Sequence, residues 1–152
     1  LCYAILNEVY KRIGLPLDDK TLFENSVKLL GDKVKIYSAI YNDKIVGVRI
    51  GLLYKKEIYD WYAGSIQEYK RLNINDFLCY NVLLWGKNNG FSVFNFGGAG
   101  NPNEAYGVRE HKMKFGGELL EFGRFEIIYN SFLYNLSKLG LSIYKIIKKR
   151  KW

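Results

Sequence analysis

The sequence is poor in the side chains that bind metals or form disulfides. Its 152 residues include one histidine, two cysteines and one methionine. Zinc sites need several His, Cys or carboxylate ligands at close, regular spacing, and this composition argues against one. Cys2 and Cys79 are far apart and both fall in apolar helical patterns. We interpret them as buried free thiols of a reducing compartment rather than a disulfide or redox pair.

Long apolar runs are also missing. No stretch of 18 apolar residues exists, so no transmembrane helix is predicted. The first residues include Asn7 and Glu8, which do not fit the apolar region of a signal peptide. The chain starts at Leu1 rather than Met, inside an apparent helix, so we expect a piece of a longer protein. We predict a cytoplasmic protein, with possible peripheral contact at the inner face of the membrane.

Acidic residues are missing from one end of the chain. Residues 132–152 contain six Lys or Arg and no Asp or Glu, whereas residues 1–131 contain 17 Lys or Arg against 15 acids. The net charge of +8 therefore belongs mainly to the tail. A basic isoelectric point is thus no argument for nucleic-acid binding by the whole protein.

The rest of the composition is that of one globular domain. Apolar residues make up 49% and aromatic residues 16%, enough for a hydrophobic core at this length. Helical periodicity is present over 2–13 and again from Asp18 or Asp19 to Leu30. Residues 34–42, 45–54 and 57–63 then alternate, with turn residues between them, which predicts an antiparallel meander of three strands.

The second half changes pattern. A helix capped by Asn73 or Asn75 is predicted to end at Gly90, followed by an apolar strand over 91–96 that is buried on both faces. A strand–helix–strand order predicts a parallel pair. Residues 101–104 form a helix start, so we expect a helix to about Lys114 and a strand over 118–130. The predicted fold class is α+β, with a mixed sheet flanked by helices.

A glycine-rich turn follows the predicted apolar strand. Gly97, Gly98 and Gly100 let the backbone turn sharply and expose its amides, and the next helix directs its N-terminus toward them. Such a place suits an anionic or carbonyl-bearing ligand. A purely structural turn is an equal alternative. Neither a P-loop nor a complete dinucleotide-binding pattern is present.

The helix after this turn is basic. Arg109 and Lys112 are three residues apart and share a face. A lysine here could stabilise an oxyanion or hold a phosphate, while a solvated basic face is the simpler alternative. His111 has no serine or cysteine partner in a suitable context, so a catalytic triad is not indicated. Tyr106 is a candidate proton donor.

Several motifs together resemble one family. They are Tyr106–Arg109, His111–Glu118, Gly123–Arg124, the strand end Asn95–Gly98 and the aromatic strand Trp61–Ser65. In this order they resemble the C-terminal signature of FemAB-like acyltransferases, which belong to the GNAT N-acetyltransferase superfamily. The resemblance covers about residues 34–130. It implies a GNAT-like mixed sheet, with an antiparallel meander followed by a crossover helix and a parallel strand.

The sequence departs from this family in two places. His111 stands where the family has Phe. The acetyl-CoA pyrophosphate motif of other GNAT enzymes is absent between Gly64 and Asn75. The donor therefore stays open between acyl-CoA and aminoacyl-tRNA, with no tightly bound cofactor. FemAB-like proteins carry two GNAT-like units, and residues 1–131 resemble the second, which leaves the activity of the isolated unit open.

The resemblance implies an N-acyltransferase that acts on an amine of a cell-wall precursor or surface polysaccharide. Lys112 would stabilise negative charge, and Tyr106 would donate a proton. No metal is expected. The residues expected to bind donor or acceptor are Trp61, Gly64, Ser65, Asn95, Gly97, Gly98, Arg109, His111, Phe115 and Gly116.

Two alternatives accompany this hypothesis. The domain could be a non-catalytic binding module that docks a partner, tRNA or an anionic membrane surface. Residues 132–152 are predicted to form a basic amphipathic helix. That helix would either lie on an anionic membrane or pack its apolar stripe on the domain.

Overall fold

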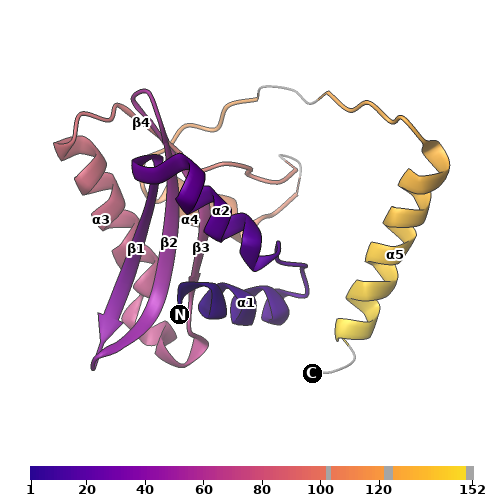
Figure 1. Cartoon of the computed structure of the whole chain (residues 1–152), viewed down its shortest axis with the longest axis horizontal. Helices are drawn as coiled ribbons and strands as arrows, with labels where there is room; N and C mark the ends of the chain where they lie inside the picture. Colours follow the sequence, from indigo (N-terminus) through magenta and orange to yellow (C-terminus); the bar gives the residue numbers. More distant parts are fainter. Residues whose placement is uncertain (102–103, 122–124, 150–152) are drawn as a thin grey trace.

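The computed structural model describes residues 1–101, 104–121 and 125–149, and Figure 1 shows their arrangement. Four strands form one sheet, and five α-helices and two short 3₁₀ helices surround or follow it. The helices are α1 Cys2–Ile13, α2 Lys20–Leu30, η1 Gly31–Lys33, η2 Gln67–Leu72, α3 Ile74–Asn88, α4 Gly107–Met113 and α5 Ser131–Lys149; the strands are β1 Val34–Tyr41, β2 Lys44–Tyr54, β3 Glu57–Ser65 and β4 Val93–Asn95.

The sheet has the predicted mixed topology. Its strand order is β1-β2-β3-β4, in which the first two pairs are antiparallel and β3 pairs with β4 in parallel. The β1–β2 turn places Asn42 and Asp43 at positive φ, as tight hairpins require. Helix α3 makes the crossover between the parallel strands. The α+β fold class predicted from the sequence is confirmed.

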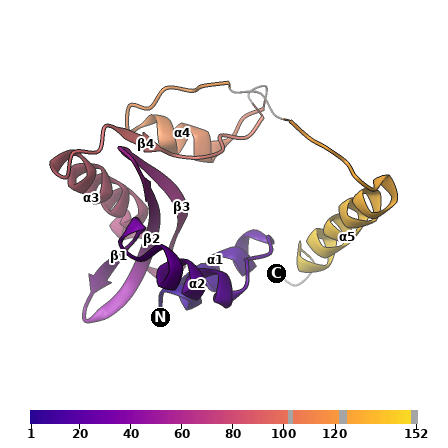
Figure 2. The same ribbon diagram turned by 45° about the horizontal axis from the view of Figure 1, so that its top comes forward.

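Helices cover both faces of the sheet. Helices α1 and α2 pack on one face through a core that includes Leu6, Phe23 and Val48. Helix α3 packs on the other face, with Ile74 and Leu78 against the sheet (Figures 1 and 2). Local residues set the start of α2 and the end of α1. The Asp19 carboxylate accepts a hydrogen bond from the Thr21 amide at 2.9 Å and caps α2, and Gly14 ends α1 in the left-handed conformation.

A close approach brings α3 onto β2. A Cβ at Gly47 would lie 2.3 Å from Cγ2 of Ile74, so only glycine fits between strand and helix. Because of this contact, the first turn of α3 lies directly against the sheet.

A β-bulge interrupts the pairing of β2 and β3. Ile50 pairs with Tyr62 whereas Gly51 pairs with Asp60, so Trp61 is the extra residue on β3. Bulges bend a strand and change the direction of its side chains. As a result, the side chains of Asp60 and Tyr62 do not follow the regular alternation of faces along β3.

The prediction that residues 91–96 form a strand buried on both faces was wrong. Strand β4 is limited to Val93–Asn95, and the Val93 side chain is 51% exposed. The physical reason is its position, because β4 is the edge of the sheet and pairs on one side alone. Its apolar residues line the cavity described below rather than a closed core.

Two predictions about the region after β4 were also wrong. The helix begins at Gly107, not at 101–104, which makes Tyr106 its N-cap residue. Pro102 and Asn103 lie outside the described residues; the Asn101 amide donates to the Glu104 carboxylate at 2.9 Å, so it caps a local turn. The described parts of 118–130 contain no strand, because no strand lies beside them to pair with.

The tail helix was predicted correctly, but it does not pack on the sheet. Helix α5 stands apart from the sheet and its covering helices in both views (Figures 1 and 2). Phe132 is 75% exposed and Leu139 is 57% exposed. The apolar stripe of α5 is therefore uncovered within the described chain.

Candidate active site

The two parallel strands separate after a short pairing. Strand β4 pairs with β3 over Glu57–Tyr59 alone, and β3 continues to Ser65. Among the described residues, no strand pairs with that side of β3 from Asp60 to Ser65. An open strand edge of this kind offers main-chain N–H and C=O groups to an extended ligand.

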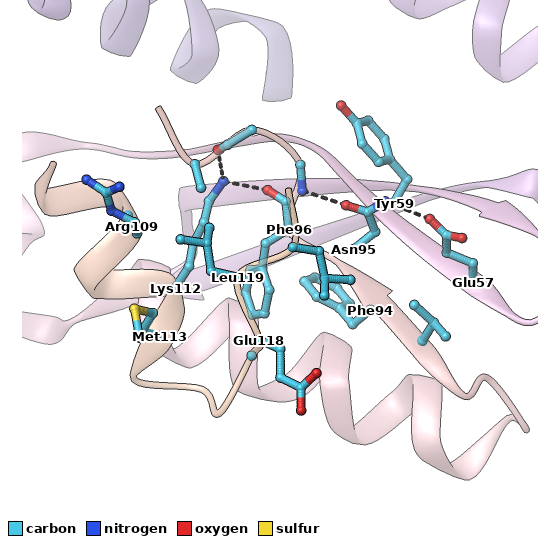
Figure 3. Close-up of a pocket in the computed structure, with 16 residues that line it drawn as sticks. Glu57, Tyr59, Phe94, Asn95, Phe96, Arg109, Lys112, Met113, Glu118 and Leu119 are labelled. Atoms are coloured by element: carbon cyan, nitrogen blue, oxygen red, sulfur yellow. Dashed lines mark hydrogen bonds between the residues drawn. The ribbon is translucent and has the colours of Figure 1, made fainter. Parts of the chain in front are cut away.

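A cavity of about 600 Å³ lies at the end of β4 (Figure 3). Its shape depends on Asn95, whose amide donates to the Glu57 carboxylate at 2.8 Å and whose side-chain oxygen accepts from the Gly97 amide at 2.9 Å. Gly97 adopts φ +68°, which glycine tolerates without strain. The turn predicted as a ligand cradle is therefore fixed by the last residue of β4.

Lys112 on α4 joins the turn to the helix. Its ammonium group donates to the carbonyl oxygens of Phe96 at 2.5 Å and Gly98 at 2.7 Å. Burial lowers the pKa of Lys112, while the nearby Asp60 carboxylate raises it and Arg49 lowers it. Lys112 lines both this cavity and a second one, so it stands between them.

The second cavity, about 370 Å³, contains a buried charged pair. Nη1 of Arg49 on β2 lies 3.4 Å from Oδ2 of Asp60 on β3, and Arg49 is 4% exposed. Burial raises the pKa of Asp60; Arg49, Lys112 and His111 oppose that rise. A cluster of perturbed charges in a concave site is typical of function, although structural ion pairs also perturb pKa values.

Contacts with α3 and aromatic rings hold α4 over the second cavity. Nδ1 of His111 lies 3.2 Å from Oδ1 of Asp76 in the first turn of α3. The rings of His111 and Phe115 are 5.5 Å apart, and Phe115 in turn lies 6.1 Å from Phe96. His111 thus links α4 to the first turn of α3.

Six of the twelve predicted site residues line the two cavities. Asn95, Gly97, Gly98, Arg109 and Lys112 line the first cavity. His111 lines the second with Lys112, and Phe115 supports both through its ring contacts.

The other predicted residues line neither cavity. Trp61 packs against Phe23 with ring centroids 5.4 Å apart. Gly64 lies under α1, where a Cβ would be 2.9 Å from Cγ2 of Val9. Tyr106 packs its ring against Gly100. Ser65 ends β3, and Gly116 is in the left-handed conformation just after α4.

The sequence reasoning missed Arg49 and Asp60. A signal was present, because each is a lone charge inside an otherwise uncharged part of a strand. Counting outward from the turn at Lys55 and Lys56 sets Asp60 opposite Gly51 and places Arg49 two residues farther along on the same face. Opposite charges on one face of a hairpin predict such a pair.

No group of three or more His, Cys, Asp or Glu side chains in the described ranges is arranged to hold a metal ion. Among the helices described, none is both long and apolar enough to cross a membrane.

Solved structures share this fold. An aminoglycoside acetyltransferase, meta-AAC0020 from an uncultured soil metagenomic sample, is 14% identical with a TM-score of 0.58, and the match covers 84% of this chain and 86% of that one. A possible acetyltransferase from Clostridium difficile 630 is 17% identical with a TM-score of 0.60, covering 82% and 86%. Aminoglycoside N-acetyltransferase AAC(6')-Iy, solved with CoA, is 13% identical with a TM-score of 0.50, covering 73% and 86%.

The sequence itself matches one family model. No curated protein sequence matches the chain. The model described as "Acetyltransferase (GNAT) domain" matches residues 5–112, from α1 to the end of the site on α4. This range contains the open edge of β3, the glycine turn and Lys112. The chain therefore belongs to the GNAT acetyltransferase domain family, a membership that supports N-acyltransferase activity.

Proposed function

We propose that this protein transfers an acyl group from acyl-CoA to a primary amine. The observation that carries the proposal is the open edge of β3 from Asp60 to Ser65, which borders the second cavity through Asp60 and Ala63. The amide groups of a pantetheine arm match such an edge, as an added strand would. The CoA complex of a structural neighbour supports this donor.

The chemistry requires charge stabilisation at the carbonyl. The neutral amine nitrogen attacks the thioester carbon, the C–N bond forms and the C–S bond breaks. The thiolate takes a proton from the proton donor, and the proton lost by the nitrogen replaces it on that donor. Two of the three Lys112 donors are used on the turn. The third is available for the developing oxyanion. Tyr106 remains the proposed proton donor, although Tyr59 is the tyrosine that lines the first cavity.

The first cavity suits the acceptor amine. The carboxylates of Glu57 and Glu118 line it beside the cations of Arg109 and Lys112, and they would hold a protonated amine, which releases one proton to solvent before it attacks. The FemAB-like motifs on β3, on β4 and after α4 support a finer proposal: the acceptor is an amine on a cell-wall precursor or surface polysaccharide, and residues 1–131 are the second GNAT-like unit of a longer protein.

The test is acyl transfer by the chain, in its longer parent protein where that exists. Thiol release from acetyl-CoA would be followed with amino-sugar acceptors. Lys112→Ala should lower the rate at least tenfold, or about 1.4 kcal/mol. Lys114→Ala is the matched control, since Lys114 is an exposed lysine just past α4. No thiol release and no thermal shift with CoA would leave a binding module as the better description.

A second proposal concerns α5, which we infer to contact an anionic membrane surface peripherally. The apolar side chains from Phe132 to Ile147 that are exposed have exposed fractions of 42% to 75%. The Lys138 ammonium lies 4.2 Å from the centre of the Tyr134 ring. The sequence of 132–152 adds six basic residues and no acid. An apolar stripe with basic residues and no acids is typical of interfacial helices.

Flotation with vesicles tests this contact. The protein should float with phosphatidylglycerol-containing vesicles at low salt, and less so at high salt. Leu139→Gln with Ile143→Gln should abolish flotation. Ser137→Gln with Ser142→Gln is the matched pair on exposed polar positions of the same helix. Failure to float with anionic vesicles would contradict the proposal.

A further inference from the structure

The second cavity contains buried polar atoms without a hydrogen bond. Nε of Arg49 and Oδ1 of Asp60 and of Asn75 form none among the described residues, and Nη1 of Arg49 has its 3.4 Å ion pair with Oδ2 of Asp60 but no hydrogen bond. Arg49 is 4% exposed, and all three residues line the cavity. Buried donors and acceptors are nearly always satisfied in folded proteins. Polar groups of water or of a ligand in the cavity would satisfy these atoms.

The charges around the cavity favour an anionic occupant. Arg49 from β2 and Lys112 from α4 face it as cations, against the single carboxylate of Asp60 from β3. His111 also lines it from α4, but its Nδ1 is engaged by Asp76 of α3. A protonated amine would meet two cations, whereas an oxyanion would meet the unused donors of Arg49.

The cavity is larger than an acetyl group requires. Its 370 Å³ corresponds to roughly twelve waters at about 30 Å³ each. Asp60 and Ala63 form its wall on the open edge of β3, and Phe96 and Val108 add apolar surface. A short aliphatic chain with a polar end fits this combination of walls.

We propose that the second cavity binds a carboxylate carried by one of the two substrates, and that Arg49 is its main ligand. This assignment rests on the proposed acyl-CoA function. Because the second cavity lies beside the open edge of β3, where the donor is proposed to bind, we assign the carboxylate to the donor. The transferred group is then a dicarboxylic acyl group. A carboxylate on the acceptor is the other source of the same chemistry.

Matched four-carbon ligands test the proposal. Binding of CoA, butyryl-CoA and succinyl-CoA would be measured by calorimetry, since succinyl and butyryl differ in a terminal carboxylate. Succinyl-CoA should bind at least tenfold more tightly than butyryl-CoA. In the variant R49M/D60L, which replaces the pair with apolar side chains of similar size, that preference should disappear while CoA still binds. Lys114→Met, the matched loss of a nearby cation, should keep it.

The acceptor arm uses 4-aminobutyrate and butylamine with CoA present. Tighter binding of 4-aminobutyrate, lost in R49M/D60L, would assign the carboxylate to the acceptor. The proposal would be overturned if succinyl-CoA bound no more tightly than butyryl-CoA and 4-aminobutyrate bound no more tightly than butylamine. Absence of CoA binding would instead overturn the proposed function, and this assignment with it.

Discussion

The ammonium group of Lys112 lies 2.7 Å from the carbonyl oxygen of Gly98, so one side chain of α4 closes the glycine turn that follows β4. A second bond to the Phe96 carbonyl fixes the same turn at its start. The lysine assigned to catalysis from the sequence therefore also holds the wall of the first cavity. A variant at this position would change both the charge and the shape of the site.

Replacement of Lys112 by Met should therefore loosen the turn as well as slow acyl transfer. We expect faster hydrogen exchange of the Gly97–Ala99 amides, together with a loss of kcat of tenfold or more. Exchange mass spectrometry measures the first effect. Lys114→Met should change neither, and unaltered exchange in Lys112→Met would show that the turn is stable without its lysine.

Asp60 should make stability depend on pH. A carboxyl whose pKa is raised in the folded state contributes stability that is full below the unfolded value of 3.8 and is lost as the pH rises through the folded pKa. We expect the free energy of unfolding of Asp60→Asn, measured relative to that of the unmodified protein, to increase as the pH rises from 4. Urea titrations across that range measure it, and a flat difference would mean that Asp60 ionises normally.

The two thiols should react differently. Burial raises the pKa of Cys79 to about 11, whereas Cys2 is partly exposed, with its sulfur 3.6 Å from the Ser38 hydroxyl. At pH 8 we expect Ellman's reagent to modify one thiol quickly in the folded protein and both in urea. In Cys2→Ser the quick reaction should vanish. A rapid reaction of Cys79 in that variant would contradict its burial.

Gly64 should matter for stability rather than for binding. A methyl group there would meet Val9 of α1 at 2.9 Å, so Gly64→Ala should destabilise the fold by about 1–3 kcal/mol. Gly140 in α5 has open space around it, and Gly140→Ala should be neutral or stabilise the helix by about 0.5–1 kcal/mol. Thermal unfolding of both variants measures this. Weaker CoA binding with unchanged stability in Gly64→Ala would restore its predicted role.

Local signals were sufficient for the meander and most helices. Asp19, Gly14 and Asn42 act through their own backbone neighbours, so the sequence around each predicts its role. The late start of α4 and the missing strand after it depend on distant partners, which local patterns do not encode.

The site residues divide in the same way, into those that a local motif indicates and those that depend on distant contacts. Lys112 and Asn95 were found because their motif is contiguous, whereas Arg49 and Asp60 belong to different strands and meet through hairpin pairing. Trp61 was assigned to ligand binding because the strand Trp61–Ser65 resembles an aromatic strand of the FemAB-like family. A bulge and contact with Phe23 give it a packing role.

The missing side chain of Gly47 lets α3 lie close to the sheet, and α3 carries Asn75, which lines the second cavity, and Asp76, which contacts His111. The width of that cavity is thus determined partly by a residue that touches no proposed substrate. During divergence of such proteins, exchange of one small residue under α3 could shift the preferred length of the acyl chain while every ligand-contacting residue stays the same.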